Sequence, residues 1–466
     1  MVLWWLLLWA CAGPSGPKDS GDSQTSVGPT DSEDTSETGA ETGETSQTGE
    51  TGETGETSET GGAGGAPAGE ATLQLDCEVA EPEGLAVRVW WPAEADARHP
   101  AGAPILVRVG GAGFLGWDLG HDPGYATSNG AAVVQFLRPG TSDPDGSSSG
   151  GLDDLGGTSV RESVTCILDF VLRDGTALDG SSIDDLFPHR GHVVTTGLSL
   201  GGTHVLNVLR ADPDLAVPAA VLWESPLTGQ LTLQEVSPVT GVDPLFSPGT
   251  CTLDNGCPFP GRASLLRWDA ASAMPYQDTN GTDTLDPDEL YYRPLVDAAT
   301  GVSYFSNELH REISMNAADV FGGPQPAGWP SAADTAETWR TWGATETLID
   351  IRDNGSDRAF IVLASGNDHS QILHEHTRVG MEGVSGASFF RLNGDAAYVE
   401  GLGVSSSSEF DAMVVVSDHN TLAALPDPRP DAQVLAAELE LADRVEHGVW
   451  DVDLAEPLQA VTSLVE

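Results

Sequence analysis

Several continuous apolar runs in the middle of the chain constrain the fold more than any other feature. They cover residues 103–110, 130–140, 191–197, 218–225 and 359–366, and helix-like segments at 159–175 and 200–213 lie between some of them. Apolar runs that do not alternate with polar residues are typical of strands covered on both faces. Strands that alternate with helices favour parallel pairing. The sequence therefore predicts an α/β fold with a mostly parallel, doubly wound sheet.

Further strand-like runs lie on either side of this central set. Residues 72–80 and 85–93 precede it, and residues 388–393 and 411–417 follow it. The first two runs are expected to add an antiparallel pair at one edge of the sheet.

The region from about 226 to 347 interrupts this alternation. It is rich in Pro, Gly and Asp, and it is too long for a simple connection. We therefore expect a large insertion that forms a cap or lid over the carboxyl edge of the sheet. Its tryptophans are expected to pack in a core, with an apolar substrate pocket as the alternative; they are Trp268, Trp329, Trp339 and Trp342.

The chain begins with two segments that do not resemble a folded domain. Residues 1–11 are an apolar run, too short for a membrane span, that ends in Leu8-Trp9-Ala10-Cys11 and resembles a bacterial lipoprotein signal. That resemblance implies lipidation of Cys11; an ordinary secretory signal is the alternative. Residues 12–70 are rich in Gly, Ser, Thr and Glu and are expected to form a disordered tether. The folded domain is expected at 71–466, on an exported protein.

The charge of the chain is strongly negative. With 20 Lys+Arg against 71 Asp+Glu, the net charge is −51. Such a surface repels phosphate backbones, so nucleic acid is excluded as a partner. Adaptation to salt or display on an exposed surface would explain the acidity, and so would plain composition with an acidic linker.

One serine stands at the junction of a strand-like and a helix-like segment. Ser199 lies in Gly197-Leu198-Ser199-Leu200-Gly201, after an apolar run and before helical periodicity. A serine on such a turn projects above the sheet, and the N-terminus of the following helix favours a developing oxyanion. The same spacing occurs around Ser148, in Gly146 to Gly150, but without a strand before it or a helix directly after it. We therefore interpret the second match as a loop.

The Ser199 turn resembles that of the α/β-hydrolase superfamily, and the resemblance covers about 85–226 and 358–425. It implies an α/β-hydrolase-type fold with Ser199 as the nucleophile and the N–H of Leu200 as one oxyanion donor. The second donor is expected from the glycine-rich loop after 103–110, at Ala112 or a neighbour.

The same resemblance implies an acid and then a histidine further along the chain. Asp368, just past the run at 359–366, is the favoured acid, with Asp395 as the alternative. His419, which follows the run at 411–417, is the favoured base. The competing histidines are His369, His374 and His376, whereas His204 is expected to serve packing.

The remaining cysteines suit an oxidising compartment. Cys251 and Cys257 are close enough in sequence to close a small loop as a disulfide. Cys166 lies in a helix-like run, where a plain buried thiol is an equal alternative to a disulfide.

Residues 278–289 resemble an EF-hand calcium loop. The candidate ligands are Asp278, Asn280, Thr282, Thr284, Asp286 and Glu289. The loop departs from the pattern because Thr282 occupies the fifth position and Asp283 replaces the glycine at the sixth. The two interpretations are a weakened structural Ca²⁺ site and an acidic surface loop without metal.

Together these features predict an exported serine hydrolase, tethered to the membrane by a lipid anchor in a bacterial cell envelope or extracellular. It is expected to cleave a small-molecule or lipid-like ester, with a peptide as the less favoured substrate, through an acyl-enzyme and without a required cofactor. The alternative is a hydrolase-like surface binding protein with an incomplete site.

Overall fold

The computed structural model describes residues 66–111, 123–154, 157–173, 175–228, 242–247, 249–296, 301–363, 375–393 and 432–450. All of them belong to one compact unit, residues 65–466. Within these ranges, every helix is too short or too polar to cross a membrane.

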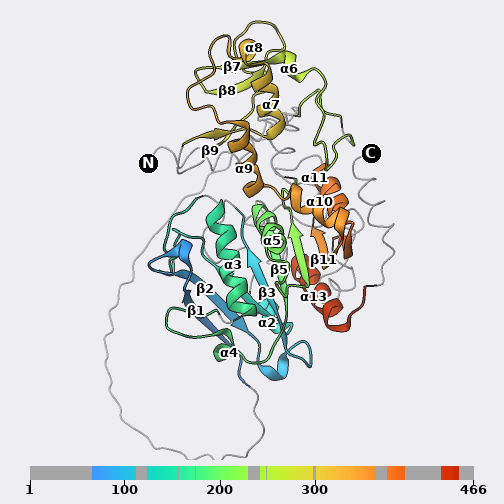
Figure 1. Ribbon diagram of the computed structural model, residues 1–466. Helices are drawn as coiled ribbons and strands as arrows, with labels where there is room; N and C mark the ends of the chain where they lie inside the picture. Colours follow the sequence, from blue (N-terminus) through green and yellow to red (C-terminus); the bar gives the residue numbers. More distant parts are fainter. Residues whose placement is uncertain are drawn as a thin grey trace, which may run out of the picture. The chain divides into compact units, whose positions relative to one another are not determined.

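The centre of the protein is an eight-stranded sheet in the order β1-β2-β4-β3-β5-β6-β11-β12 (Figure 1). The strands are β1 (Gly69–Leu75), β2 (Leu85–Trp91), β3 (Ala103–Val109), β4 (Ala132–Phe136), β5 (Arg190–Leu198), β6 (Ala219–Trp223), β11 (Ser356–Leu363) and β12 (Ala387–Leu392). These strands confirm eight of the predicted runs; the ninth, 411–417, lies outside the described residues.

The sheet combines an antiparallel edge with a parallel body. β2 pairs antiparallel with both β1 and β4. All pairs from β4 through β12 are parallel. Because parallel strands end at the same edge, the residues that follow β3, β5, β6, β11 and β12 leave the sheet on one side.

Helices cover both faces of the sheet, as the buried strands require. One core contains apolar side chains of α3 (Thr158–Leu172), α5 (Leu200–Ala211), α10 (Thr345–Asn354) and α11 (Glu375–Val384). The other contains side chains of α2 (Pro123–Ser128) and α13 (Ala432–His447). Figure 1 shows α3 and α5 in front of the central strands. This arrangement confirms the prediction of a doubly wound sheet.

A buried ion pair joins α13 to two strands near their carboxyl ends. Arg108 on β3 makes two bonds to Glu438, Nε to Oε1 at 3.0 Å and Nη2 to Oε2 at 2.7 Å, and both residues are buried. The hydroxyl of Thr196 on β5 donates to Glu438 Oε1 at 2.6 Å. The pair therefore fixes α13 against the strands that precede Gly110 and Ser199.

Between β6 and β11 the chain forms a region with an apolar core of its own. Its elements are α6 (Arg262–Leu265), β7 (Leu266–Asp269), β8 (Met274–Gln277), β9 (Leu295–Val296), β10 (Ser303–Tyr304), α7 (Asn307–Met315), α8 (Ala317–Phe321) and α9 (Ala332–Trp342). Trp268 and Trp329 pack against Phe305 and Phe321 in this core, which confirms core packing for these two tryptophans. We call residues 226–347 the insertion.

The insertion is fastened to α5 by polar side chains. Asn207 on α5 donates from Nδ2 to the carbonyls of Arg340 at 3.3 Å and Gly343 at 3.0 Å. Its Oδ1 accepts a hydrogen bond from Thr347 at 2.9 Å. The helix that follows Ser199 is therefore also the helix that holds the end of α9 and the start of α10.

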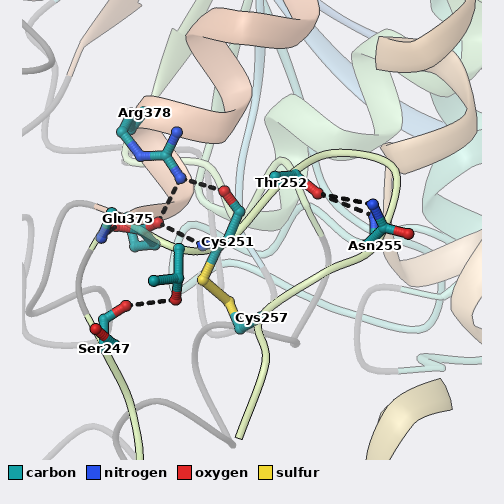
Figure 2. The surroundings of a disulfide bond; sticks show 9 residues. Ser247, Cys251, Thr252, Asn255, Cys257, Glu375 and Arg378 are labelled. Carbon is teal, nitrogen blue, oxygen red and sulfur yellow. Dashed lines mark hydrogen bonds and ion pairs between the residues drawn. A yellow bond between two sulfur atoms is a disulfide. The ribbon is translucent and has the colours of Figure 1, made fainter.

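Two disulfides cross-link the described residues. Cys251 and Cys257 form the predicted small loop, and Figure 2 shows this loop against the first turn of α11. There the Glu375 carboxylate accepts hydrogen bonds from the N–H groups of Gly249 at 3.0 Å and Cys251 at 3.1 Å. The plain-thiol interpretation of Cys166 was wrong, because Cys166 is bonded to Cys77 across 89 residues.

The short helical elements complete the description. They are the 3-10 turns Glu78–Ala80 and Glu94–Asp96 and the helix α4 (Ile183–Leu186), whose N-terminus is capped by Ser182.

Candidate active site

Ser199 occupies a tight turn between β5 and α5. Its backbone has φ 50° and ψ −128°, a left-handed φ that non-glycine residues rarely adopt. The N–H of Ser199 donates to the carbonyl of Trp223 on β6 at 2.8 Å, and its carbonyl accepts from the N–H of Gly202 at 3.0 Å. Backbone bonds therefore hold the strained turn on both sides, with the side chain half-buried.

The glycines around Ser199 are required by space. A Cβ on Gly197 would lie 2.3 Å from the Cα of Gly202, and a Cβ on Gly201 would lie 2.3 Å from the carbonyl oxygen of Val109. A Cβ on Gly202 would lie 2.0 Å from the hydroxyl oxygen of Ser225. The start of α5 therefore packs against β3, β5 and the end of β6 with no room for side chains.

The loop after β3 lies against the same serine. A Cβ on Gly111 would stand 2.8 Å from Ser199 Cβ and 3.4 Å from Ser199 Oγ, so the Gly110–Gly111 backbone passes beside the hydroxyl. Ala112, the favoured second oxyanion donor, lies outside the described residues.

Helix α5 starts immediately after the serine. Leu200 is its first residue, so its N–H is one of the N-terminal groups that have no partner within the helix. Those groups and the helix dipole favour negative charge near Ser199. His204 lies further along the same helix and is buried, with 1% of its surface exposed.

The acid and the base predicted from the sequence fall in other parts of the chain. Asp368, Asp395, His369, His374 and His419 lie outside the described residues. His376 is within α11, but its side chain also lies outside them. Their order along the chain is nevertheless clear: Asp368 follows β11 and His419 follows β12, and both strands run parallel to β5.

Glu224 is a residue at this edge that sequence reasoning missed. It follows β6 directly, is buried with 2% exposure, and has a left-handed φ of 43°. Its N–H donates to the carbonyl of Leu363, the last residue of β11, at 2.8 Å. The signal in the sequence was a carboxylate directly after the apolar run that ends in Trp223.

The second match to the serine spacing lies in a loop, as predicted. Ser148 is exposed, it forms an isolated bridge with Ser142, and α3 begins ten residues later at Thr158. The strand-to-helix turn found at Ser199 is therefore not repeated in this loop.

The calcium-like loop uses its carboxylates to bind its own backbone. Asp278 Oδ1 accepts from the N–H groups of Gly281 at 2.7 Å and Thr282 at 3.1 Å. The two oxygens of Glu289 accept from Thr279 at 2.9 Å and Asp286 at 3.1 Å.

The remaining candidate ligands of this loop also bond to one another. Asn280 donates to Asp286 at 2.7 Å, and the hydroxyl of Thr284 donates to that of Thr282 at 3.1 Å. Asp283, which replaces the expected glycine, takes a left-handed φ of 53°. Among the described residues, no group of three or more His, Cys, Asp or Glu is arranged to hold a metal ion.

A cavity of about 590 Å³ lies beside α5, but Ser199 is not among the described residues that line it. Its lining comes from the second half of α5, the ends of α9 and the starts of α7 and α10. Glu308 on α7 lies there, and its buried Oε2 atom has no hydrogen-bond partner among the described residues. Burial raises the pKa of its carboxyl. This cavity is therefore separate from the serine.

Comparisons with known proteins find similarity among solved structures. No family model matches the chain, and no curated relative matches it. Among solved structures, it is similar to the mouse alpha/beta hydrolase domain-containing protein 10 (20% identity, 35% of this chain and 53% of that chain, TM-score 0.24). The chain thus spans about half the length of that protein.

Two further structures cover more of the chain. One is the alpha/beta hydrolase GrgF from Penicillium sp. sh18 (13% identity, 70% of this chain and 89% of that chain, TM-score 0.33). The other is the thioesterase domain from the curacin biosynthetic pathway (10% identity, 79% and 99%, TM-score 0.34). The strand order, the parallel body and the turn after β5 define a fold of the α/β-hydrolase type.

Proposed function

We propose that the protein is a serine hydrolase that cleaves an ester bond through an acyl-enzyme. The observation that carries the proposal is the left-handed, hydrogen-bonded turn at Ser199, between a buried parallel strand and the N-terminus of α5. Strain of this kind persists only where the surroundings impose it, and it gathers at functional sites.

In the proposed reaction a histidine removes the proton from Ser199 Oγ as the oxygen attacks the carbonyl carbon of the ester. The carbonyl oxygen becomes an oxyanion, and the N–H of Leu200 is positioned to donate to it. A second donor is assigned to the loop after Gly111, at Ala112 or a neighbour. The histidine then protonates the departing alcohol, which leaves an acyl group on Ser199.

Water then hydrolyses the acyl-enzyme, with water as the nucleophile and Ser199 as the leaving group. The histidine takes a proton from water, the hydroxide oxygen attacks the acyl carbon, and Ser199 leaves with the proton returned by the histidine. The products are a carboxylic acid and an alcohol, and no cofactor is consumed.

His419 and Asp368 remain the proposed base and acid. Their support is positional: β11 and β12 run parallel to β5, so segments that follow these strands leave the sheet at the edge where Ser199 lies. The carboxylate would fix the imidazole tautomer and stabilise the imidazolium.

We also propose that the enzyme is exported, with Cys11 as a lipid anchor and residues 12–70 as a tether. The disulfides Cys77–Cys166 and Cys251–Cys257 support an oxidising compartment. A small-molecule or lipid-like ester is the proposed substrate class. Loss of the protein from the membrane fraction on Cys11→Ala would support the anchor, and unchanged partitioning would contradict it.

The test of the function is labelling with a serine-reactive fluorophosphonate. The intact protein should be labelled, Ser199→Ala should not, and Ser148→Ala, at the matched spacing in a loop, should label like the wild type. Hydrolysis of nitrophenyl esters should likewise be retained by the wild type and by Ser148→Ala and lost in Ser199→Ala. A folded wild-type protein that is neither labelled nor active would contradict the proposal and favour a binding protein.

A further inference from the structure

We propose that a second ligand site lies beside α5, separate from Ser199, and that it binds a small zwitterion with an ammonium and a carboxylate, such as an amino acid or a short peptide. The site is the cavity of about 590 Å³ between α5 and the insertion. The inference goes beyond the proposed function and does not depend on it, because it comes from the side chains that line this cavity.

The cavity lies where the insertion meets the helices on one face of the sheet. Its walls come from α3, α5, the small disulfide loop, α7, α9 and α10. Helix α9 contacts both α5 and α7 (Figure 1). Small molecules bind in cavities of about 300–1,000 Å³, often between helices or domains. The size and the position of this cavity therefore suit a molecule of one to a few amino acids.

Most of the charged side chains that line the cavity are already paired. Four ion pairs with N–O distances of 2.6–3.2 Å involve them: Arg210–Glu346, Arg340–Glu346, Arg340–Glu337 and Arg352–Asp254. Because these charges neutralise one another, they are not the groups that would select a charged ligand.

Two lining charges of opposite sign remain. Among the described residues, the half-buried Arg161 on α3 has no ion-pair partner, and Glu308 on α7 has none either. The Glu308 Oε2 atom is buried without a hydrogen-bond partner in the same part of the chain. Burial outweighs the charges of Arg311 and Arg262 and raises the pKa of the Glu308 carboxyl. A buried charge is costly unless an opposite charge faces it, so both groups would gain from a ligand.

A third polar group in the wall also lacks a partner. Thr228 is 6% exposed, and its buried hydroxyl has no hydrogen-bond partner among the described residues. Buried hydroxyl groups are nearly always hydrogen-bonded, so this exception at the wall of a cavity indicates an occupant. The hydroxyl can donate to a carbonyl or accept from an N–H group. Apolar surface for the rest of the molecule comes from Trp339, Leu253 and Ile349.

These groups fit a zwitterion better than a simple ion. A guanidinium such as that of Arg161 binds a carboxylate through two parallel N–H bonds. An ammonium would donate to the Glu308 carboxylate and supply the opposite charge that it lacks. A simple anion would leave Glu308 without a counter-charge, and a simple cation would leave Arg161 without one. One molecule with both charges satisfies both residues.

The experiment measures the binding of alanine, dialanine and trialanine to the whole chain by isothermal titration calorimetry. These unblocked probes carry the same two charges at increasing separation. At least one should bind with a Kd of about 1 mM or below. Acetylation of the ammonium or amidation of the carboxylate of the tightest probe should weaken its binding by about 10-fold or more. The measurement does not involve ester hydrolysis, so its outcome is distinguishable from failure of the proposed function.

Arg161→Gln and Glu308→Gln should each weaken the tightest probe by about 10–100-fold. Arg161→Gln should not weaken the amidated probe further, and Glu308→Gln should not weaken the acetylated probe further, because each variant and its analogue remove the same contact. The matched controls are Glu162→Gln and Arg173→Gln, on exposed residues of α3 and its end that are not among the described lining residues. They should bind like the wild type, with folding checked by thermal melting. Absence of binding by every probe, binding that survives either cavity substitution, or an equal loss in the controls would overturn the inference.

Discussion

Gly111 lies so close to Ser199 that there is no room for a side chain between them. A Cβ built on Gly111 would lie 2.8 Å from Ser199 Cβ, a separation that real Cβ atoms do not tolerate. The loop after β3 and the turn after β5 are therefore fitted to each other. This close approach brings the backbone of the loop beside the hydroxyl that the proposed reaction uses.

Gly111→Ala should lower kcat/KM by about 10²-fold, because a displacement of about 1 Å at a reacting group has that effect. The measurement is ester hydrolysis on protein with an unchanged melting profile. Gly323→Ala is the control, since a Cβ there would meet only the Phe321 carbonyl at 3.9 Å. Full activity of Gly111→Ala would contradict the proximity of loop and nucleophile.

The left-handed φ of Ser199 predicts an effect on stability that is independent of catalysis. Ser199→Gly and Ser199→Ala should both abolish hydrolysis, but the glycine variant should be more stable by about 1 kcal/mol because glycine adopts this φ without strain. Chemical denaturation measures the difference. Ser148 lacks a positive φ, so Ser148→Gly should not be more stable than Ser148→Ala. Equal stability of Ser199→Gly and Ser199→Ala would contradict strain at Ser199.

The sheet could be predicted from the sequence because burial on both faces leaves uninterrupted apolar runs. The turn at Ser199 could be predicted because glycine spacing, strand and helix are all local. The Cys77–Cys166 bond could not, since it joins residues 89 positions apart and Cys166 alone fits a plain thiol equally well.

The burial of Glu438 and Glu224 could not be predicted from the sequence for a related reason. Glu438 lies in a charged stretch of α13 that is typical of a solvated helix face, and only its partner Arg108, 330 positions earlier, explains its burial. Glu224 becomes notable only through its φ and its register with Ser199. Long-range pairing of polar groups leaves no periodic signal along the chain.

Glu438→Ala should reduce the free energy of unfolding by about 3–5 kcal/mol, because it leaves the buried Arg108 guanidinium without its carboxylate. Urea denaturation measures the loss. The triple variant Arg108→Met, Thr196→Val, Glu438→Leu removes every partner together and should recover most of that stability. A triple variant as unstable as Glu438→Ala would mean that packing, rather than the orphaned charge, sets the effect.

Glu308 should make stability depend on pH. Burial raises the pKa of the Glu308 carboxyl above its value in the unfolded chain. The stability that the protonated carboxyl contributes is therefore fully present below the unfolded pKa and is lost as pH rises through the folded pKa. Glu308→Gln should therefore gain stability relative to wild type as pH rises above the ordinary pKa of a glutamate. A constant difference for Glu308→Gln would contradict the burial effect.

Thermal melting with Ca²⁺ distinguishes the two interpretations of the loop at 278–289, a weakened structural site and an acidic surface loop without metal. As a weakened site that lacks the fifth carboxylate and the sixth glycine, the loop should bind in the range of about 10⁻⁴–10⁻³ M. About 10 mM Ca²⁺ should then stabilise the protein by about 1.4–2.7 kcal/mol, and Glu289→Gln should remove the effect. Mg²⁺ at the same concentration controls for general screening of the −51 charge. An equal shift with Mg²⁺, or one that survives Glu289→Gln, would identify the loop as an acidic surface segment whose carboxylates serve only its own backbone.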